Sequence, residues 1–87
     1  MMYCSMGVQV MPLVAAEQYE VTAAPAVQSL RESGAVTAEG PMEVTLEGDL
    51  DELFIIVKAA QAACLAAGAR QVCTVLRISN ACPTCRV

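Results

Sequence analysis

The amino-acid sequence predicts an α+β fold in which two helices cover one face of a four-stranded antiparallel sheet. Alternating apolar and polar residues indicate four strands, because neighbouring side chains of a strand point to opposite faces. Apolar residues spaced three and four apart indicate two helices. These elements follow the order strand, helix, strand, strand, helix, strand. That order predicts the ferredoxin-like split βαβ (βαββαβ) arrangement, with the core at residues 4–79 of a single domain, 1–87.

The first strand is expected over Cys4–Met11. Val8 and Val10 point to one face of this strand, and Gln9 points to the other. Pro12 ends the strand, since proline has no N–H to donate to the neighbouring strand.

The first helix is indicated by an apolar stripe of Tyr19, Ala23, Ala26, Val27 and Leu30. Pro25 lies inside this stripe, where an interior proline costs about 3 kcal/mol. Either the helix begins with Thr22 as N-cap, which puts Pro25 in the first turn, or a longer helix begins near Glu17 and kinks. We prefer the longer helix because Tyr19 fits the stripe, and we expect Gly34 to follow its end.

The stretch from Gly40 to Gly68 predicts a strand, a tight corner and the second helix. A short strand, Ala35–Glu39, precedes it. In the third strand Met42, Val44 and Leu46 alternate with Glu43, Thr45 and Glu47. Asp49 then stands at the N-cap and Glu52 three residues later, a spacing that predicts a capping box. Gly68 supplies the C-terminal stop of the helix.

A fourth strand is expected over Arg70–Ser79, with Thr74 on the helix-facing side, and Asn80 to Val87 form a tail. The second face of the sheet carries polar and apolar groups that no helix of this chain covers. A small domain buries a modest share of its surface, so association offers further stability. We therefore expect a homodimer or homotetramer.

The composition excludes several classes of function. The chain is 56% hydrophobic, but its longest apolar runs fall short of the roughly 20 residues of a membrane helix. The net charge of −4, with five Lys and Arg residues, makes nucleic acid a poor partner. The absence of His removes the commonest acid–base catalyst, and no Gly-rich phosphate loop is present. We expect a non-enzymatic, cytoplasmic protein without cofactor or membrane association.

Five cysteines are present, two of them in the pair Cys82 and Cys85 near the C-terminus. A redox Cys-x-x-Cys motif needs a following helix, and only two residues follow Cys85. A structural zinc site needs four ligands, whereas one chain offers this pair and Cys4. Metal binding through the pair therefore remains an alternative, in which the protein is an oligomeric interaction module without a small-molecule ligand.

Four short stretches, taken together and in order, resemble the YkoF-type thiamine/hydroxymethylpyrimidine-binding family and related single-domain thiamine-binding proteins. They are Gln9–Leu13, Gly40–Met42, Leu46–Asp49 and Leu76–Ile78. The resemblance covers about residues 4 to 83. It implies a ferredoxin-like fold, self-association, and non-catalytic binding of thiamine or its hydroxymethylpyrimidine moiety in vitamin B1 transport or salvage. Met11 replaces a frequent aromatic residue of the family, and Val44 replaces a frequent threonine.

Two faces of the sheet offer candidate ligand-binding residues, and the sequence does not choose between them. Gln9, Met11, Thr45 and Glu47 belong to the open face, while Tyr19, Met42, Val44 and Thr74 belong under the helices. Tyr19 could stack on a pyrimidine, and thioethers fit irregular pockets. A carboxylate such as Glu47 could attract a thiazolium cation. Each of these residues is also common in plain packing or on a solvated surface.

Overall fold

The computed structural model describes residues 2–40 and 43–80. Its elements are β1 (Tyr3–Pro12), a 3₁₀ turn η1 (Ala16–Gln18), α1 (Tyr19–Glu32), β2 (Val36–Glu39), β3 (Val44–Asp49), α2 (Leu50–Ala66) and β4 (Val72–Asn80). Their order is the one that the sequence predicts. β2, β3 and β4 begin one or two residues later than expected. No helix within the described ranges is both long and apolar enough to cross a membrane.

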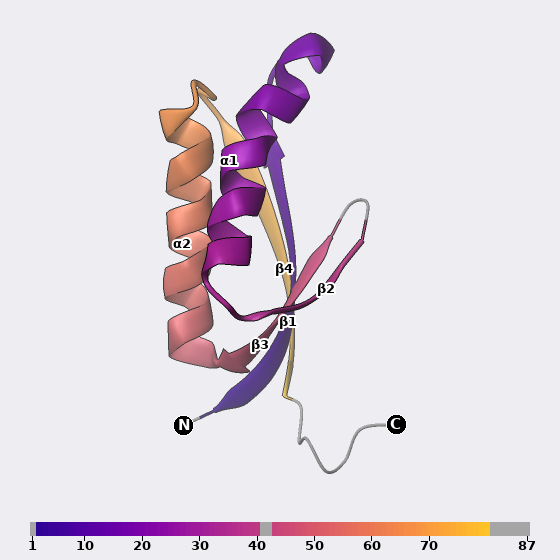
Figure 1. The fold of residues 1–87 in the computed structure, drawn as a ribbon, viewed down its shortest axis with the longest axis vertical. Helices are drawn as coiled ribbons and strands as arrows, with labels where there is room; N and C mark the ends of the chain where they lie inside the picture. Colours follow the sequence, from indigo (N-terminus) through magenta and orange to yellow (C-terminus); the bar gives the residue numbers. More distant parts are fainter. Residues whose placement is uncertain (1, 41–42, 81–87) are drawn as a thin grey trace.

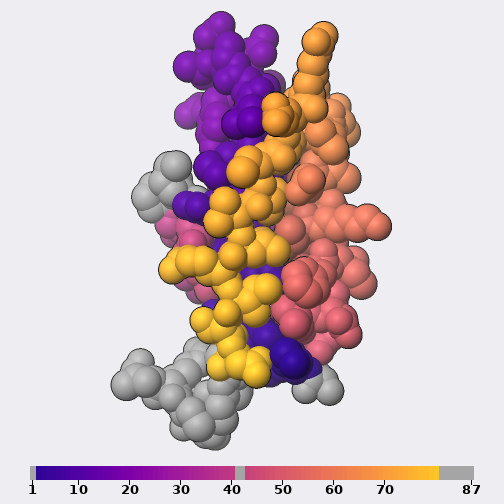
Figure 2. Space-filling model, turned by 180° about the vertical axis from the view of Figure 1, so that it is seen from behind, coloured from indigo at the N-terminus to yellow at the C-terminus, as the bar shows by residue number. Residues whose placement is uncertain are grey.

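The four strands form one antiparallel sheet in the order β2-β3-β1-β4. Both helices lie side by side on one face of this sheet (Figure 1). The ferredoxin-like prediction is confirmed. β4 is an edge strand, and Figure 2 shows its side chains running the length of the molecule beside α2.

The core lies between the sheet and the helices. The strands contribute Cys4, Met6, Val8, Val44 and Leu46, and the helices contribute Ala26, Leu30, Leu53, Val57, Ala60 and Cys64. The predicted alternation therefore holds in β1 and β3, whose apolar face packs under the helices. Full burial of a side chain such as Leu46 stabilises the fold by about 1.5–3 kcal/mol.

The longer of the two helices considered for the first half of the chain is correct. α1 begins at Tyr19, after the turn η1, and Pro25 lies inside it. Thr22 is not an N-cap: its hydroxyl donates to the carbonyl oxygen of Gln18 at 2.7 Å, one turn earlier in the helix. The carbonyl of Thr22 accepts a bond from the Cys64 thiol at 3.3 Å, which ties α1 to α2.

The capping box predicted for α2 is wrong. Asp49 occupies the N-cap position with extended backbone, but its side chain makes no capping bond. Met2, near the start of the chain, instead bonds to both residues at this corner. The N–H of Leu50 donates to the carbonyl of Met2 at 2.9 Å, and Asp49 Oδ1 accepts from the Met2 backbone N–H at 3.2 Å.

The C-terminal boundary also differs from the prediction. Asn80 was expected in the tail, yet it pairs with Cys4 as the last residue of β4. The Cys4 thiol donates to the side-chain oxygen of Asn80 at 3.3 Å. Cys82 and Cys85 lie outside the described residues.

Candidate functional site

One side of α1 carries a row of residues at intervals of four. The row consists of Tyr19, Ala23, Val27 and Arg31. Residues four apart are neighbours on successive turns of an α-helix, so the four side chains form an inclined ridge along α1. At a rise of about 1.5 Å per residue, Tyr19 and Arg31 stand about 18 Å apart along the axis. The row thus carries the aromatic ring of Tyr19 at one end and the guanidinium cation of Arg31 at the other. The small side chains of Ala23 and Val27 lie between them.

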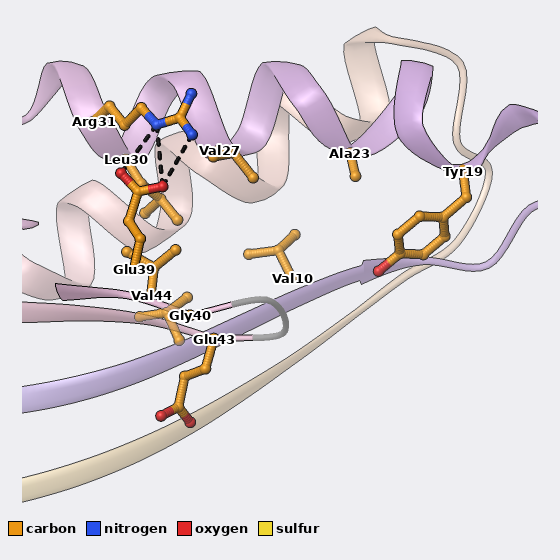
Figure 3. Close-up of a pocket in the computed structure, with 11 residues that line it drawn as sticks. Val10, Tyr19, Ala23, Val27, Leu30, Arg31, Glu39, Gly40, Glu43 and Val44 are labelled. Atoms are coloured by element: carbon orange, nitrogen blue, oxygen red, sulfur yellow. Dashed lines mark hydrogen bonds and ion pairs between the residues drawn. The ribbon is translucent and has the colours of Figure 1, made fainter.

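This row faces the sheet across a pocket of about 290 Å³, which we call the helix-side pocket. It is lined by Val8, Val10, Tyr19, Ala23, Val27, Leu30, Arg31, Glu39, Gly40, Glu43 and Val44. Figure 3 shows Tyr19 at one end and the side chains of Arg31 and Glu39 at the other. Its volume lies near the lower end of the range of small-molecule pockets, about 300–1,000 Å³. Apolar walls with polar ends suit a flat, partly polar ligand.

A bidentate ion pair between Arg31 of α1 and Glu39 of β2 forms the polar end of this pocket. Arg31 Nη2 lies 2.9 Å from Glu39 Oε1, and Arg31 Nε lies 3.0 Å from Glu39 Oε2. The hydrogen bonds from the guanidinium lower the pKa of Glu39, and those same bonds raise the pKa of Arg31. Both groups are therefore charged at neutral pH. Because both are partly exposed, the pair contributes little to stability.

Glu43 borders the helix-side pocket, but its carboxylate lies elsewhere. Figure 3 shows this side chain pointing away from the pocket. On the opposite face of the sheet it forms an ion pair with Arg77, whose Nε lies 3.0 Å from Glu43 Oε2. Among the described residues, the ionic groups directed at the helix-side pocket are thus Arg31 and Glu39.

The open face of the sheet holds a smaller hollow of about 180 Å³, the open-face pocket. It is lined by Ser5, Gly7, Glu43, Thr45, Arg77 and Ser79. Its lining consists of hydroxyls, one ion pair and a glycine. Because none of these residues is aromatic or aliphatic, the hollow lacks the apolar walls that are typical of small-molecule sites.

The structure brings together two of the four residues expected under the helices. Tyr19 and Val44 both line the helix-side pocket. Thr74 does not line it, because its hydroxyl donates to Gln61 Oε1 at 2.8 Å, in the contact between β4 and α2. Met42 lies outside the described residues.

The candidate residues of the open face do not gather around one hollow. Thr45 lines the open-face pocket, whereas Gln9 and Met11 are half-buried and line neither pocket. Glu47 accepts a hydrogen bond from the Tyr3 hydroxyl at 3.1 Å. It also accepts a longer one from the Thr37 hydroxyl at 3.4 Å.

Neither Arg31 nor Glu39, the ion pair of the helix-side pocket, is among the ligand-binding residues that the sequence predicts. Arg31 stands four residues after Val27, so extending the apolar row by one step would have placed it beside the pocket. Glu39 carries no comparable signal, because its place depends on how β2 pairs with β3. Ala23 and Val27 were expected in the apolar stripe but not as pocket walls.

Cys4, Cys64 and Cys73 are free thiols. Within residues 2–40 and 43–80, no group of three or more His, Cys, Asp or Glu side chains could hold a metal ion. Burial raises the pKa of the Cys64 thiol, so this sulfur stays protonated at neutral pH.

The sequence and the fold match known proteins. The model of a family described as thiamine-binding protein matches residues 6–81. A UPF0045 protein of Clostridium perfringens is 31% identical over 75 residues, which cover 86% of this chain and 79% of that protein. A solved domain of unknown function, DUF77, from Bacillus cereus is 36% identical with a TM-score of 0.81, covering 88% of this chain and 74% of its own.

A solved Thermotoga maritima protein, proposed to act in thiamine biosynthesis or salvage, has a TM-score of 0.78 against this chain. The match covers 87% of this chain and 81% of that protein. At 21% identity, this similarity shows the fold alone.

Proposed function

This chain belongs to the thiamine-binding protein family, and from that premise we propose that it binds thiamine or the hydroxymethylpyrimidine moiety of thiamine without catalysing a reaction. Such binding would serve vitamin B1 transport or salvage. The Thermotoga maritima protein of the same fold is proposed to act in thiamine biosynthesis or salvage. The observation that carries the proposal is the helix-side pocket, where one aromatic ring, apolar walls and one ion pair surround about 290 Å³.

The chemistry of the pocket suits the two halves of thiamine. A pyrimidine ring needs an apolar slot with a few polar partners, which the valines and the ends of the pocket provide. Tyr19 offers a ring face for stacking and a hydroxyl for one hydrogen bond. The thiazolium half is a cation, and the net charge of −4 favours its approach.

We propose Tyr19 and Val44 as ligand contacts on the helix side. They are the two expected binding residues that line the larger of the two pockets. Gln9, Met11, Thr45 and Glu47 belong to a rival site on the open face, which a second subunit would have to complete.

A homodimer or homotetramer is part of the proposal. The motivation is the uncovered sheet face together with exposed apolar side chains on α2. These are Phe54, Ile55 and Leu65, which are 44%, 68% and 46% exposed. Exposed apolar groups on one side of a protein often mark an interface. Sedimentation velocity at micromolar concentration should show a species larger than the 9.1 kDa chain, and a monomer alone would contradict association.

Calorimetry and thermal unfolding with thiamine test the proposed function. A ligand at one hundred times its Kd stabilises the folded protein by about 2.7 kcal/mol, so the melting temperature should rise. The free hydroxymethylpyrimidine should act in the same direction, and adenosine triphosphate serves as the heteroaromatic control without effect. No heat and no thermal shift with millimolar thiamine or pyrimidine would contradict the proposal.

A further inference from the structure

We propose that the Arg31–Glu39 ion pair sets the charge specificity of the helix-side pocket: it admits the unphosphorylated vitamin and disfavours its phosphate esters. This inference rests on the proposed function and names the ligand class of the same site. Thiamine and its free pyrimidine carry no phosphate, whereas thiamine monophosphate carries an anionic group at one end. A charged group at a fixed place in the pocket discriminates between them by charge.

The pair occupies such a place. The described residues that line the pocket include three charged side chains, Arg31, Glu39 and Glu43. The Glu43 carboxylate is engaged by Arg77 on the other face of the sheet. Arg31 comes from α1 and Glu39 from β2, and they meet at the end of the pocket opposite Tyr19 (Figure 3).

The geometry of the pair disfavours a phosphate. Arg31 uses Nε and Nη2 on Glu39, and this bidentate edge is the one that a phosphate group would otherwise take. A bound phosphate must displace Glu39 or share Arg31 with it. Either arrangement brings two negative groups together, in a protein whose net charge is already −4.

An uncharged pyrimidine meets no such conflict. The guanidinium and the carboxylate neutralise one another, so the pair presents hydrogen-bonding groups without net charge. A thiazolium cation is attracted by Glu39 and repelled by Arg31 in similar measure. The pocket therefore accepts either half of thiamine while the pair stays intact.

Substitutions that remove one charge of the pair should shift the ligand preference in opposite directions. Calorimetry would give the Kd of thiamine and of thiamine monophosphate for each protein. In the parent, thiamine should bind more tightly. Glu39→Gln leaves Arg31 unopposed and should shift the affinity ratio about fivefold toward the monophosphate, the size of an exposed charge interaction. Arg31→Gln should shift the ratio about fivefold toward thiamine, and high salt should reduce both shifts.

Matched controls separate a local charge from net charge. Glu52→Gln and Arg70→Gln make the same changes in net charge at exposed positions outside the pocket, and they should leave the ratio unchanged. The double variant Arg31→Glu with Glu39→Arg restores a neutral pair with reversed partners. It should return the ratio toward the parent value, and circular dichroism would verify the fold of every variant.

The outcomes distinguish this inference from the proposed function. Suppose that the parent binds thiamine but that both pocket variants show the same ratio of affinities for thiamine and its monophosphate as the controls. The proposed role of the pair in charge specificity is then wrong, and the proposed function stands. The role is also wrong if the parent prefers the monophosphate. If the parent binds neither compound, the proposed function fails, and the inference fails with it. If a single variant does not fold, the reversed pair still decides: a large departure from the parent ratio contradicts the proposal.

Discussion

A Cβ atom on Gly7 would lie 2.9 Å from the carboxyl carbon of Glu43. Gly7 stands between Thr45 of β3 and Arg77 of β4 in the sheet register. The missing side chain lets the Glu43 carboxylate lie over β1 and reach Arg77. A single glycine thus permits an ion pair that crosses β1 on the open face, from Glu43 just before β3 to Arg77 of β4.

This relationship predicts that substitutions at Gly7 and Arg77 are not additive. Glycine within a strand costs about 0.5–1 kcal/mol relative to alanine, so Gly7→Ala gains that amount in the backbone. It also displaces Glu43 from Arg77, an exposed pair worth about 0.2–1 kcal/mol. The two effects should nearly cancel in the parent. In an Arg77→Gln background, Gly7→Ala should stabilise by about 0.5–1 kcal/mol.

Urea unfolding of the parent, both single variants and the double variant measures this coupling. High salt should weaken the coupling, because the ion pair is exposed. Equal effects of Gly7→Ala in the two backgrounds would show that Glu43 does not depend on the glycine.

The fold could be predicted because the evidence for it is local. Alternation in β1 and β3 assigns Val8 and Val44 to the core face, and three-and-four spacing places Leu30 and Leu53 inward. These patterns record which side of each element is buried. The order of the elements then leaves few ways to form one sheet.

The candidate site was harder to predict because it depends on contacts between distant residues. Tyr19 and Val44 share a pocket only because α1 packs against β1, the strand that pairs with β3. Thr74 lies on the expected face, yet Gln61 of α2 binds its hydroxyl. Likewise, the capping-box prediction failed because Met2, far away in the sequence, donates its backbone N–H to the side chain of Asp49.

Pro25 should reduce the stability of α1. Proline has no N–H to donate to the carbonyl of Val21, and its ring crowds the preceding turn. Pro25→Ala restores that donor and should stabilise the helix. The substitution also increases the conformational entropy of the unfolded chain, which offsets up to about 1 kcal/mol of this stabilisation. We expect a net stabilisation of about 1–2 kcal/mol in urea unfolding.

The neighbouring residue provides the comparison for Pro25. Ala24 is exposed in the same turn, and Ala24→Pro should destabilise by about 3 kcal/mol. A loss of stability in Pro25→Ala would mean that the proline ring is held by packing that outweighs the missing hydrogen bond.

The Cys64 thiol should make the fold sensitive to alkaline pH. Burial raises the pKa of this thiol above its ordinary value of 9.0, so the folded chain keeps a proton that the unfolded chain releases. This stabilising contribution is complete below the unfolded pKa and is lost as the pH rises toward the folded pKa. The free energy of unfolding should fall by up to about 1.4 kcal/mol per pH unit above about pH 9.

Unfolding experiments between about pH 7.5 and pH 10 would measure this fall. Cys64→Ala should lower stability at neutral pH, since it leaves a small cavity, but it should flatten the alkaline slope. Cys73→Ala alters an exposed thiol and should keep the slope of the parent. A slope that persists unchanged in Cys64→Ala would assign the alkaline effect to other groups.

Three substitutions test which face of the sheet binds thiamine. Tyr19→Ala removes the ring at one end of the helix-side pocket and should weaken binding about tenfold, as expected for a lost aromatic contact. Tyr19→Phe keeps the ring and should lose less. Val44→Thr adds a hydroxyl to a wall of the same pocket, and this polar group should tighten thiamine binding. Because the wall is buried, the unpaired hydroxyl should also lower the melting temperature of the free protein. Gln9→Ala, on the open face, should leave the Kd unchanged. Calorimetry with each variant decides the matter: weaker binding in Gln9→Ala, with Tyr19→Ala and Val44→Thr equal to the parent, would move the site to the open face.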